Sequence, residues 1–316
     1  MMMERYTGLI DARVTAWCGA LPDNALHAPM AYLMGLPAKR VRPALVLMGC
    51  ELFGGSAEHA MDEAIGIELF HNFTLMHDDI MDKAPLRRGR PTVHEKWGVN
   101  TAILSGDAMM VKAYQALGRY PEVHAVFSRC ALEVCEGQQL DMDFERRADV
   151  GVDEYMEMIR LKTGVLLACA LRIGSIVAGA GPEDQDRIAA FGEHLGLAFQ
   201  LRDDVLDAFG DTAKTGKQQG GDVRAGKKTF LLIRGLERAA ENRTGILRDE
   251  LAKSPDARDV PRMLGLLEAL GVRDEAEALA IRHHRAAFAQ LTAINAPEER
   301  KMPLIALADR LVDRSS

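Results

Sequence analysis

The chain has 316 residues, of which 48% are hydrophobic and 27% are charged, and its net charge is −7. Proteins that bind nucleic acid or anionic membranes are normally basic, so this balance argues against both kinds of partner. The length suits one large domain. Five cysteines without a CxxC pair favour reduced thiols in the cytoplasm over a disulfide framework or a zinc knuckle.

The predicted elements are helices from one end of the chain to the other. The N-terminal residues lack the apolar run of a signal peptide. No proline falls between Glu122 and Gly181 or between Glu183 and Ser254, which leaves room for several long helices. The apolar stretch Val165–Gly181 is interrupted by Arg172 and is too short for a membrane span, so we expect a buried helix.

Glycine or proline marks each expected break between helices, and no low-complexity linker divides the chain. A last helix is expected from about Asp274 to Leu291. We therefore expect one all-α domain over residues 1–316, with no sheet and no integral membrane segment. The expected breaks are 36–38, 84–91, 118–121, 179–182, 210–226 and 253–261.

The pattern DDxxD occurs twice, as DDIMD at residues 78–82 and as DDVLD at residues 203–207. In a helix, residues three or four apart share a face, so the carboxylates of each motif are neighbours and repel one another. Pro85 follows the first motif and Gly210 the second, which places both near helix C-termini. The helix dipole disfavours negative charge there, so both motifs need a positive partner.

The residues before each motif are apolar. Residues 69–76 read LFHNFTLM and residues 195–199 read LGLAF, and both stretches are typical of buried helices. One DDxxD alone is more often a solvated acidic face, whereas two on apolar helices indicate a cleft lined by oxygen ligands. Aspartate oxygens, together with water and phosphate oxygens, suit Mg²⁺.

Basic residues accompany the acidic motifs. Arg87 and Arg88 follow the first, and the glycine-rich lysine loop GKQQGGDVRAGKKT at residues 216–229 follows the second. Residues 39–43, KRVRP, form a third cluster at the start of an apolar stretch. The lysine loop fails the P-loop pattern because Lys228 stands where Ser or Thr is required. Together these groups predict sites for two diphosphates, one held through metal and one held directly by Arg and Lys.

This ordered set of motifs resembles the trans-isoprenyl diphosphate synthase (polyprenyl synthetase) family, most of all its short-chain geranylgeranyl and farnesyl diphosphate synthases. The family's GKRxRP motif appears as AKRVRP at residues 38–43, with Ala38 in place of glycine. The resemblance implies the isoprenoid synthase fold, which is a single large helical bundle around a central cleft. It also implies a cytoplasmic homodimer. The other motifs are HDDIMDKAPLRRGRPTVH at 77–94, GQQLD at 137–141, Lys162-Thr163, FQLRDD at 199–204 and the lysine loop.

The resemblance further implies a Mg²⁺-dependent prenyltransferase that joins isopentenyl diphosphate head-to-tail to an allylic diphosphate. Three Mg²⁺ ions per active site are expected on Asp78, Asp82 and Asp203, with Asp79, Asp204 and Asp207 in support. The allylic diphosphate is expected to contact Arg87, Lys162, Thr163, Gln200, Lys217 and Lys227. Isopentenyl diphosphate is expected to contact Lys39, Arg42, His71 and Arg88. The expected catalytic set is Asp78, Asp79, Asp82, Arg87, Lys162, Asp203 and Lys217.

Phe73 is the candidate determinant of product length. It stands five residues before Asp78, roughly 7.5 Å deeper in the helix at about 1.5 Å per residue. In the family, bulk at this position limits products to short chains, and Phe73 followed by the small Thr74 is most like the geranylgeranyl (C20) type, then the farnesyl (C15) type. Plain core packing is the other interpretation of Phe73.

Three alternatives remain open from the sequence. A terpene cyclase shares the fold and the first acidic motif, but it needs no second diphosphate site. A di-iron bundle is suggested by Glu68-Leu69-Phe70-His71, which fits ExxH, although no second ExxH is found. A non-catalytic subunit of a heteromeric synthase would be expected to have degraded acidic motifs, and both motifs are whole here.

Overall fold

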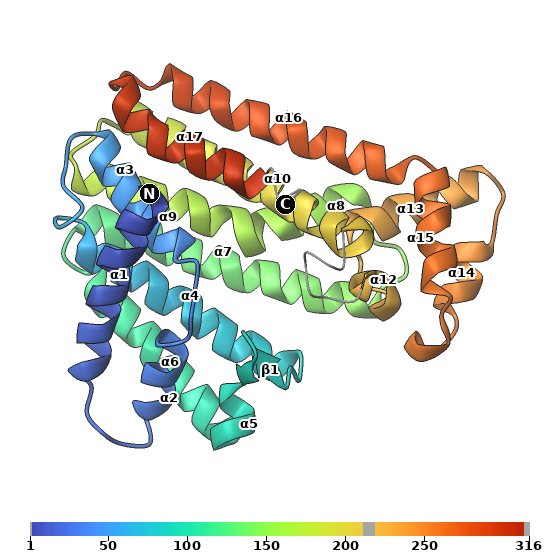
Figure 1. The fold of residues 1–316 in the computed structure, drawn as a ribbon, viewed down its shortest axis with the longest axis horizontal. Coiled ribbons are helices and arrows are strands. Elements are labelled where there is room, and N and C mark those ends of the chain that lie inside the picture. Colours follow the sequence, from blue (N-terminus) through green and yellow to red (C-terminus); the bar gives the residue numbers. More distant parts are fainter. Residues whose placement is uncertain (1, 211–218, 313–316) are drawn as a thin grey trace. The chain divides into compact units, whose positions relative to one another are not determined.

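A computed structural model describes residues 2–210 and 219–312. The predicted all-α class is confirmed, since most of the described residues lie in helices (Figure 1). The chain forms two compact units. Unit 1 comprises Met1–Arg129, Cys169–Ile188 and Asn295–Leu304, and unit 2 comprises Cys130–Ala168, Ala189–Ile294 and Ile305–Ser316. Four of the five boundaries between the units fall inside helices, and the fifth falls in the short connection that follows residue 293. The single domain with a central cleft stays a prediction.

Helix α4 (Met61–Met81) is the central element of unit 1 and packs against α3 and α6. Its first four turns are buried almost all round, as expected for a helix without a polar face. Gly66 allows a close approach, because a Cβ there would lie 2.7 Å from Cγ of Leu117. The surrounding helices are α1 (Met2–Gly19), α2 (Ala28–Met34), α3 (Val41–Leu52), α5 (Val93–Trp97) and α6 (Val99–Ala116).

A short antiparallel ribbon follows α4, which corrects the expectation of no sheet. Strand β1 (Leu86–Arg87) pairs with β2 (Arg90–Pro91), and Gly89 in the turn has φ +73°. Two-residue strands are too short to show any alternation of polar and apolar residues, so the sequence could not reveal them. The ribbon places Arg87 beside the C-terminal end of α4, where the first acidic motif lies.

Unit 2 is built around a core from α8, α10, α13, α15 and α16, with Tyr155, Leu201 and Phe230 among its buried side chains. Helix α8 (Val152–Ile159) continues through a π-helical turn, η1 (Arg160–Gly164), into α9 (Val165–Val177). Helices α7 (Pro121–Arg146), α9, α10 (Pro182–Phe209) and α17 (Glu298–Val312) contribute residues to both units. The remaining elements are α12 (Gly221–Ala225), α13 (Phe230–Glu241), α14 (Ile246–Leu251), η2 (Pro255–Ala257), α15 (Val260–Ala269) and α16 (Val272–Ala293).

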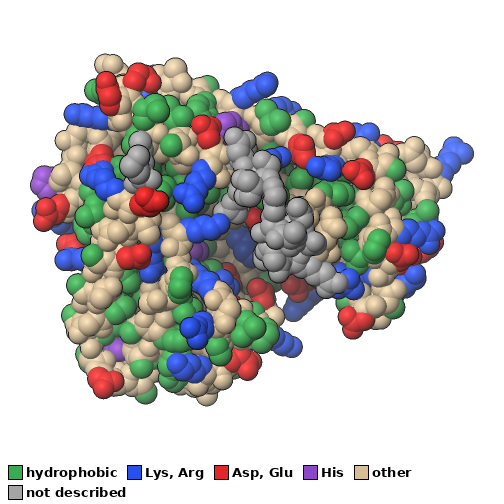
Figure 2. Space-filling view, in the orientation of Figure 1, with side chains coloured by type: hydrophobic (Ala, Val, Ile, Leu, Met, Phe, Trp, Pro, Cys, Tyr) green, Lys and Arg blue, Asp and Glu red, His purple; other side chains and the backbone are tan. Residues whose placement is uncertain are grey.

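Most expected features of the helices are confirmed. The helix expected from about Asp274 to Leu291 is α16, but it is not the last one, because α17 follows it. The helix expected in the apolar stretch after residue 165 is α9. Cys50, Cys130 and Cys169 are buried, Cys18 is half-buried and Cys135 is exposed. Figure 2 shows acidic and basic side chains interspersed over the face in view. Among residues 2–210 and 219–312, no helix combines the length and apolar character needed to cross a membrane.

Candidate active site

The first acidic motif lies at the C-terminal end of α4, as predicted, with Asp82 at the C-cap. Its three carboxylates differ in exposure, because Asp79 is buried (1% exposed), Asp78 is half-buried and Asp82 is exposed. The guanidinium of Arg87 donates from Nε to both oxygens of Asp79 at 2.9 and 2.8 Å, and from Nη2 at 2.7 Å. Asp79 therefore has its positive partner within the protein, and Asp78 and Asp82 remain the candidate metal ligands.

Arginine side chains surround His71, which lies about two turns of α4 before the acidic motif. Arg42 Nη1 donates to His71 Nε2 at 3.2 Å, and Arg88 Nη1 donates to the carbonyl of Leu36 at 3.4 Å. Burial, and then the charges of Arg42 and Arg88, hold the pKa of His71 well below its usual value. His71 is therefore neutral and accepts the hydrogen bond from Arg42. The structure thus brings together three of the four residues expected to bind isopentenyl diphosphate, and Lys39 is exposed nearby in the chain.

Phe73 belongs to an aromatic group inside unit 1. Its ring centroid lies 5.6 Å from that of Phe70 and 4.8 Å from that of His77, and Phe70 in turn lies 5.1 Å from Phe127. The side chain is 8% exposed. This environment fits core packing and is equally compatible with a bulky wall below the acidic motif.

The second acidic motif lies near the C-terminal end of α10, also as predicted. Its middle residue, Asp204, is buried like Asp79, while Asp203 is exposed. The partners of Asp204 are neutral, namely the hydroxyl of Tyr155 and the amide of Gln200, which donates at 3.2 Å. Burial raises the pKa of Asp204 to about 7, although both hydrogen bonds lower it. The hydroxyl of Tyr155 has a strongly raised pKa because of burial and Asp204, so it stays protonated and donates.

Lys162 and Thr163 lie in the π-helical turn η1. Lys162 Nζ donates to Asp141 of the GQQLD motif at 2.5 Å, and the hydroxyl of Thr163 lies 3.4 Å from Gln200 Oε1. Glycines permit this packing, since a Cβ on Gly137 would lie 2.5 Å from the backbone nitrogen of Lys162. Such π-turns are frequent at functional sites. Three residues expected at the allylic diphosphate, Lys162, Thr163 and Gln200, therefore lie together in unit 2.

The described part of the lysine loop is tied to the second acidic motif. Asp207 accepts a hydrogen bond from the backbone of Asp222 at 2.9 Å, and its own carbonyl accepts one from Gly220 at 2.7 Å. The charge of Lys227 lowers the pKa of Asp204, so this lysine lies within electrostatic range of the motif. The predicted ligand Lys217 lies outside the described residues.

Several contacts at these sites were not expected from the sequence. Tyr155 is separated from Asp204 by 49 positions and Glu68 from Arg40 by 28, so no local spacing connects them. The available signal at Tyr155 was a tyrosine within an apolar helix, because a buried hydroxyl needs a partner. Glu68 binds Arg40 at 2.6 Å, which makes it a partner of a cation rather than the iron ligand of the ExxH alternative.

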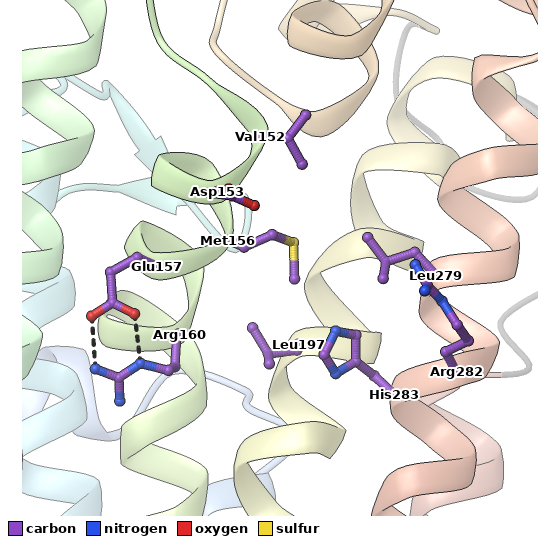
Figure 3. Close-up of a pocket in the computed structure, with 9 residues that line it drawn as sticks. All are labelled: Val152, Asp153, Met156, Glu157, Arg160, Leu197, Leu279, Arg282 and His283. Carbon is purple, nitrogen blue, oxygen red and sulfur yellow. Dashed lines mark hydrogen bonds and ion pairs between the residues drawn. The ribbon is translucent and has the colours of Figure 1, made fainter.

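A separate hollow of about 410 Å³ opens between α8, α10 and α16 in unit 2 (Figure 3). Apolar side chains, including Met156, Leu197 and Leu279, line it together with charged residues. Arg160 at its edge is paired with Glu157 through two hydrogen bonds of 2.8 Å. None of the predicted site residues lines this hollow.

The polyprenyl synthetase family model matches residues 23–267. The chain belongs to this family. A short chain isoprenyl diphosphate synthase of Methanothermobacter thermautotrophicus is 36% identical, with 99% of this chain and 98% of that protein covered. A geranylfarnesyl diphosphate synthase of Aeropyrum pernix is 35% identical over 97% of this chain and 99% of that protein. A crystal structure of a geranylgeranyl pyrophosphate synthase has a TM-score of 0.93 at 40% identity, with 99% of each chain covered.

These likenesses confirm the predicted family, the isoprenoid synthase fold and the class of enzyme, a short-chain trans-prenyltransferase acting on isoprenoid diphosphates. The family is generally Mg²⁺-dependent. In the described part of the chain, no three His, Cys, Asp or Glu side chains gather into a cation cage. Mg²⁺ in phosphate-transferring sites is commonly held by one or two carboxylates plus substrate phosphates and water. The accessible carboxylates of each motif, Asp78 and Asp82 in unit 1 and Asp203 in unit 2, are therefore suitable ligands for Mg²⁺.

Proposed function

We propose that this prenyltransferase condenses isopentenyl diphosphate head-to-tail with allylic diphosphates to give a short all-trans prenyl diphosphate. The observation that carries the proposal is the cationic group of Arg42 and Arg88 around neutral His71. Guanidinium groups bind diphosphate oxygens directly and strongly, so a cluster of arginines can hold a diphosphate that needs no metal. A terpene cyclase has no use for such a second site.

The proposed chemistry begins with heterolytic cleavage of the carbon–oxygen bond of the allylic diphosphate. Asp78, Asp82 and Asp203 would hold Mg²⁺, which when bound supplies charge stabilisation to the diphosphate. Arg87, Lys162, Lys217 and Lys227 stabilise the same negative charge as it develops. Asp141 keeps Lys162 in position, because it fixes the ammonium group at 2.5 Å.

The allylic cation is then attacked by the double bond of isopentenyl diphosphate, which is held by Lys39, Arg42, His71 and Arg88. A proton leaves the new chain and passes to the departing diphosphate, so the protein needs no nucleophile of its own. The apolar residues along α4 keep water away from the cation.

The test is product analysis after incubation with isopentenyl diphosphate, Mg²⁺ and, in turn, dimethylallyl, geranyl and farnesyl diphosphate. The proposal predicts chain elongation that EDTA abolishes. Absence of elongation with every starter would contradict it and would favour a cyclase or a subunit that needs a partner. Each alternative has its own readout, namely a cyclic hydrocarbon from an allylic diphosphate alone, or activity restored by a second chain.

For product length we propose C20 first and C15 second, with Phe73 as the wall that limits growth. The Aeropyrum pernix relative is named for a C25 product, so the assay must resolve C15, C20 and C25. Phe73→Ala is expected to lengthen the main product by one or more five-carbon units, because a cavity replaces the ring. Phe288→Ala, on α16, is the matched control and should leave product length unchanged. Unchanged length in Phe73→Ala would remove Phe73 from this role.

We also propose a homodimer in the cytoplasm, the compartment that unpaired cysteines favour. The supporting feature is α6, whose large apolar side chains Ile103, Leu104 and Val111 are 42, 61 and 52% exposed. A contiguous apolar face of this kind often marks a protein interface. Leu104→Glu is expected to give monomers in sedimentation, whereas Ile281→Glu on α16 should not. A monomeric wild-type chain would contradict the homodimer.

A further inference from the structure

Arg40 is the most deeply buried charged residue of the N-terminal basic cluster. It lies between exposed Lys39 and half-buried Arg42, and its side chain is 3% exposed. Its three donors reach three different elements of unit 1. Nε donates to Asp11 on α1 at 2.9 Å, Nη1 to Glu68 on α4 at 2.6 Å, and Nη2 to the carbonyl of Met34 on α2 at 2.7 Å.

The backbone of Arg40 is left-handed, with φ 50° and ψ 35° at the N-cap of α3. A residue with a Cβ adopts this conformation only at an energetic cost. Such a conformation persists only where the surrounding contacts determine it, and it is concentrated at functional sites. The left-handed turn sets the direction in which the chain enters α3. It therefore sets where Lys39, just before it, and Arg42, just after it, are presented.

The partners of Arg40 and Arg42 lie about one turn apart on the same helix, α4. Arg40 binds Glu68, and Arg42 binds His71, which lies three residues further along the same helix. Asn72 holds Glu68 from the other side, donating to Oε1 at 3.1 Å and to its carbonyl at 2.8 Å. The two arginine contacts thus attach the basic turn to α4 at successive points.

We infer that Arg40 is a positioning residue for the second diphosphate: its buried pairing with Glu68 holds the left-handed turn that presents Lys39 and Arg42 beside His71. Arg40 itself does not contact substrate, because its side chain is 3% exposed and each of its three nitrogens donates to a group inside the protein. The inference rests on the proposed function, in which Lys39, Arg42, His71 and Arg88 bind isopentenyl diphosphate.

The test compares steady-state KM values for isopentenyl diphosphate and for the allylic substrate. Arg40→Gln, Arg40→Lys and Glu68→Gln are each expected to raise the KM for isopentenyl diphosphate about tenfold. The kcat should change little, because each variant weakens substrate binding and leaves the chemical step unaltered. The KM for the allylic substrate should stay within about twofold, and Arg40→Lys should be the mildest change because it keeps the charge.

Leu52→Ala, at the far end of α3, is the matched control for lost stability, since Leu52 is fully buried but remote from the turn. The control should lower the melting temperature without separating the two KM values. Equal shifts of both KM values in the Arg40 variants, no shift in either, or the same separation in Leu52→Ala would each overturn the inference. If Arg40→Gln fails to fold, Arg40→Lys carries the same comparison.

Arg42→Ala in the same assay distinguishes the positioning role of Arg40 from the proposed diphosphate site itself. A raised KM for isopentenyl diphosphate in Arg42→Ala with no change in the Arg40 variants would reject the positioning role alone. An unchanged KM in Arg42→Ala would reject the proposed diphosphate site itself.

Discussion

The two acidic motifs have the same sequence pattern but neutralise their buried carboxylates in different ways. In unit 1, Asp79 is paired with the guanidinium of Arg87, which donates three hydrogen bonds. In unit 2, Asp204 is held by the neutral groups of Tyr155 and Gln200, and its pKa is raised to about 7. The first motif is therefore built on an ion pair, and the second on neutral hydrogen bonds and close helix packing.

The three aspartates of a DDxxD motif have different tasks. In both motifs the middle aspartate is buried and used for structure, while the first aspartate is more accessible. In both, the motif ends close to a helix C-terminus, where a carboxylate needs a counter-charge. The second DDxxD motif is therefore expected to repeat the function of the first only at its accessible aspartates.

The largest expected effect comes from breaking the ion pair of the first motif. Arg87→Met leaves Asp79 buried and unpaired, so we expect the free energy of unfolding to fall by about 3–5 kcal/mol. Both tryptophans, Trp17 and Trp97, lie in unit 1, so fluorescence during urea unfolding reports on this unit. The double variant Asp79→Leu/Arg87→Met should regain most of the loss. Equal stability of the two variants would contradict the ion-pair account.

The second motif should show a dependence on pH that the first lacks. The folded protein binds the proton of Asp204 more tightly than the unfolded chain, since the pKa is about 7 instead of 3.8. Stability is therefore lost as pH rises from about 4 to 7, by an amount on the order of a few kcal/mol. Asp204→Asn should flatten this slope in unfolding curves recorded by circular dichroism in EDTA. An unchanged slope would show that Asp204 does not titrate in this range.

A smaller loss of stability is expected where helices pack closely near Lys162. Gly137→Ala is expected to cost about 1–3 kcal/mol, because the new Cβ meets backbone atoms of η1 that cannot give way. Gly265→Ala is the matched control, since a Cβ there has open space around it within a helix. It should stabilise the protein by up to about 1 kcal/mol. Thermal unfolding measures both, and a neutral Gly137→Ala would mean that η1 can shift.

The smallest effect is expected from removing one neutral hydrogen bond of the second motif. Tyr155→Phe deletes the hydroxyl that binds Asp204, while Gln200 remains, so we expect a loss of about 1–2 kcal/mol at pH 8. At pH 5.5, where Asp204 is protonated, the loss should be smaller. A loss as large as that of Arg87→Met would mean that the two motifs do not differ as described.

The sequence predicted the features that depend on local spacing. Helix patterning and the position of both motifs at helix ends follow from neighbours in the chain. The roles of Asp78, Asp82 and Asp203 are implied by the family resemblance and stay predictions. The sequence could not predict which aspartate of each motif is buried, because burial depends on the elements packed against the helix. Arg87 reaches Asp79 only through the ribbon that follows α4, and that ribbon has no pattern of its own.

The sequence also could not predict contacts between residues that lie far apart in the chain. Arg40 was recognisable as part of a basic motif, but its pairing with Glu68 depends on the packing of α3 against α4. Glu68 itself resembled a metal ligand in ExxH until its partner was seen. Tyr155 and Asp141 act on residues of known motifs from positions that spacing does not connect to them.

The most direct test of the account is a Mg²⁺ titration of turnover for two pairs of variants, Asp78→Asn with Asp79→Asn and Asp203→Asn with Asp204→Asn. The account predicts that the first-position variants, Asp78→Asn and Asp203→Asn, need more Mg²⁺ for half-maximal rate, because each removes a carboxylate ligand of the ion. The middle-position variants should keep the wild-type Mg²⁺ requirement and lose or change stability instead. A higher Mg²⁺ requirement confined to Asp79→Asn and Asp204→Asn would contradict the division of tasks between the accessible and the buried aspartates.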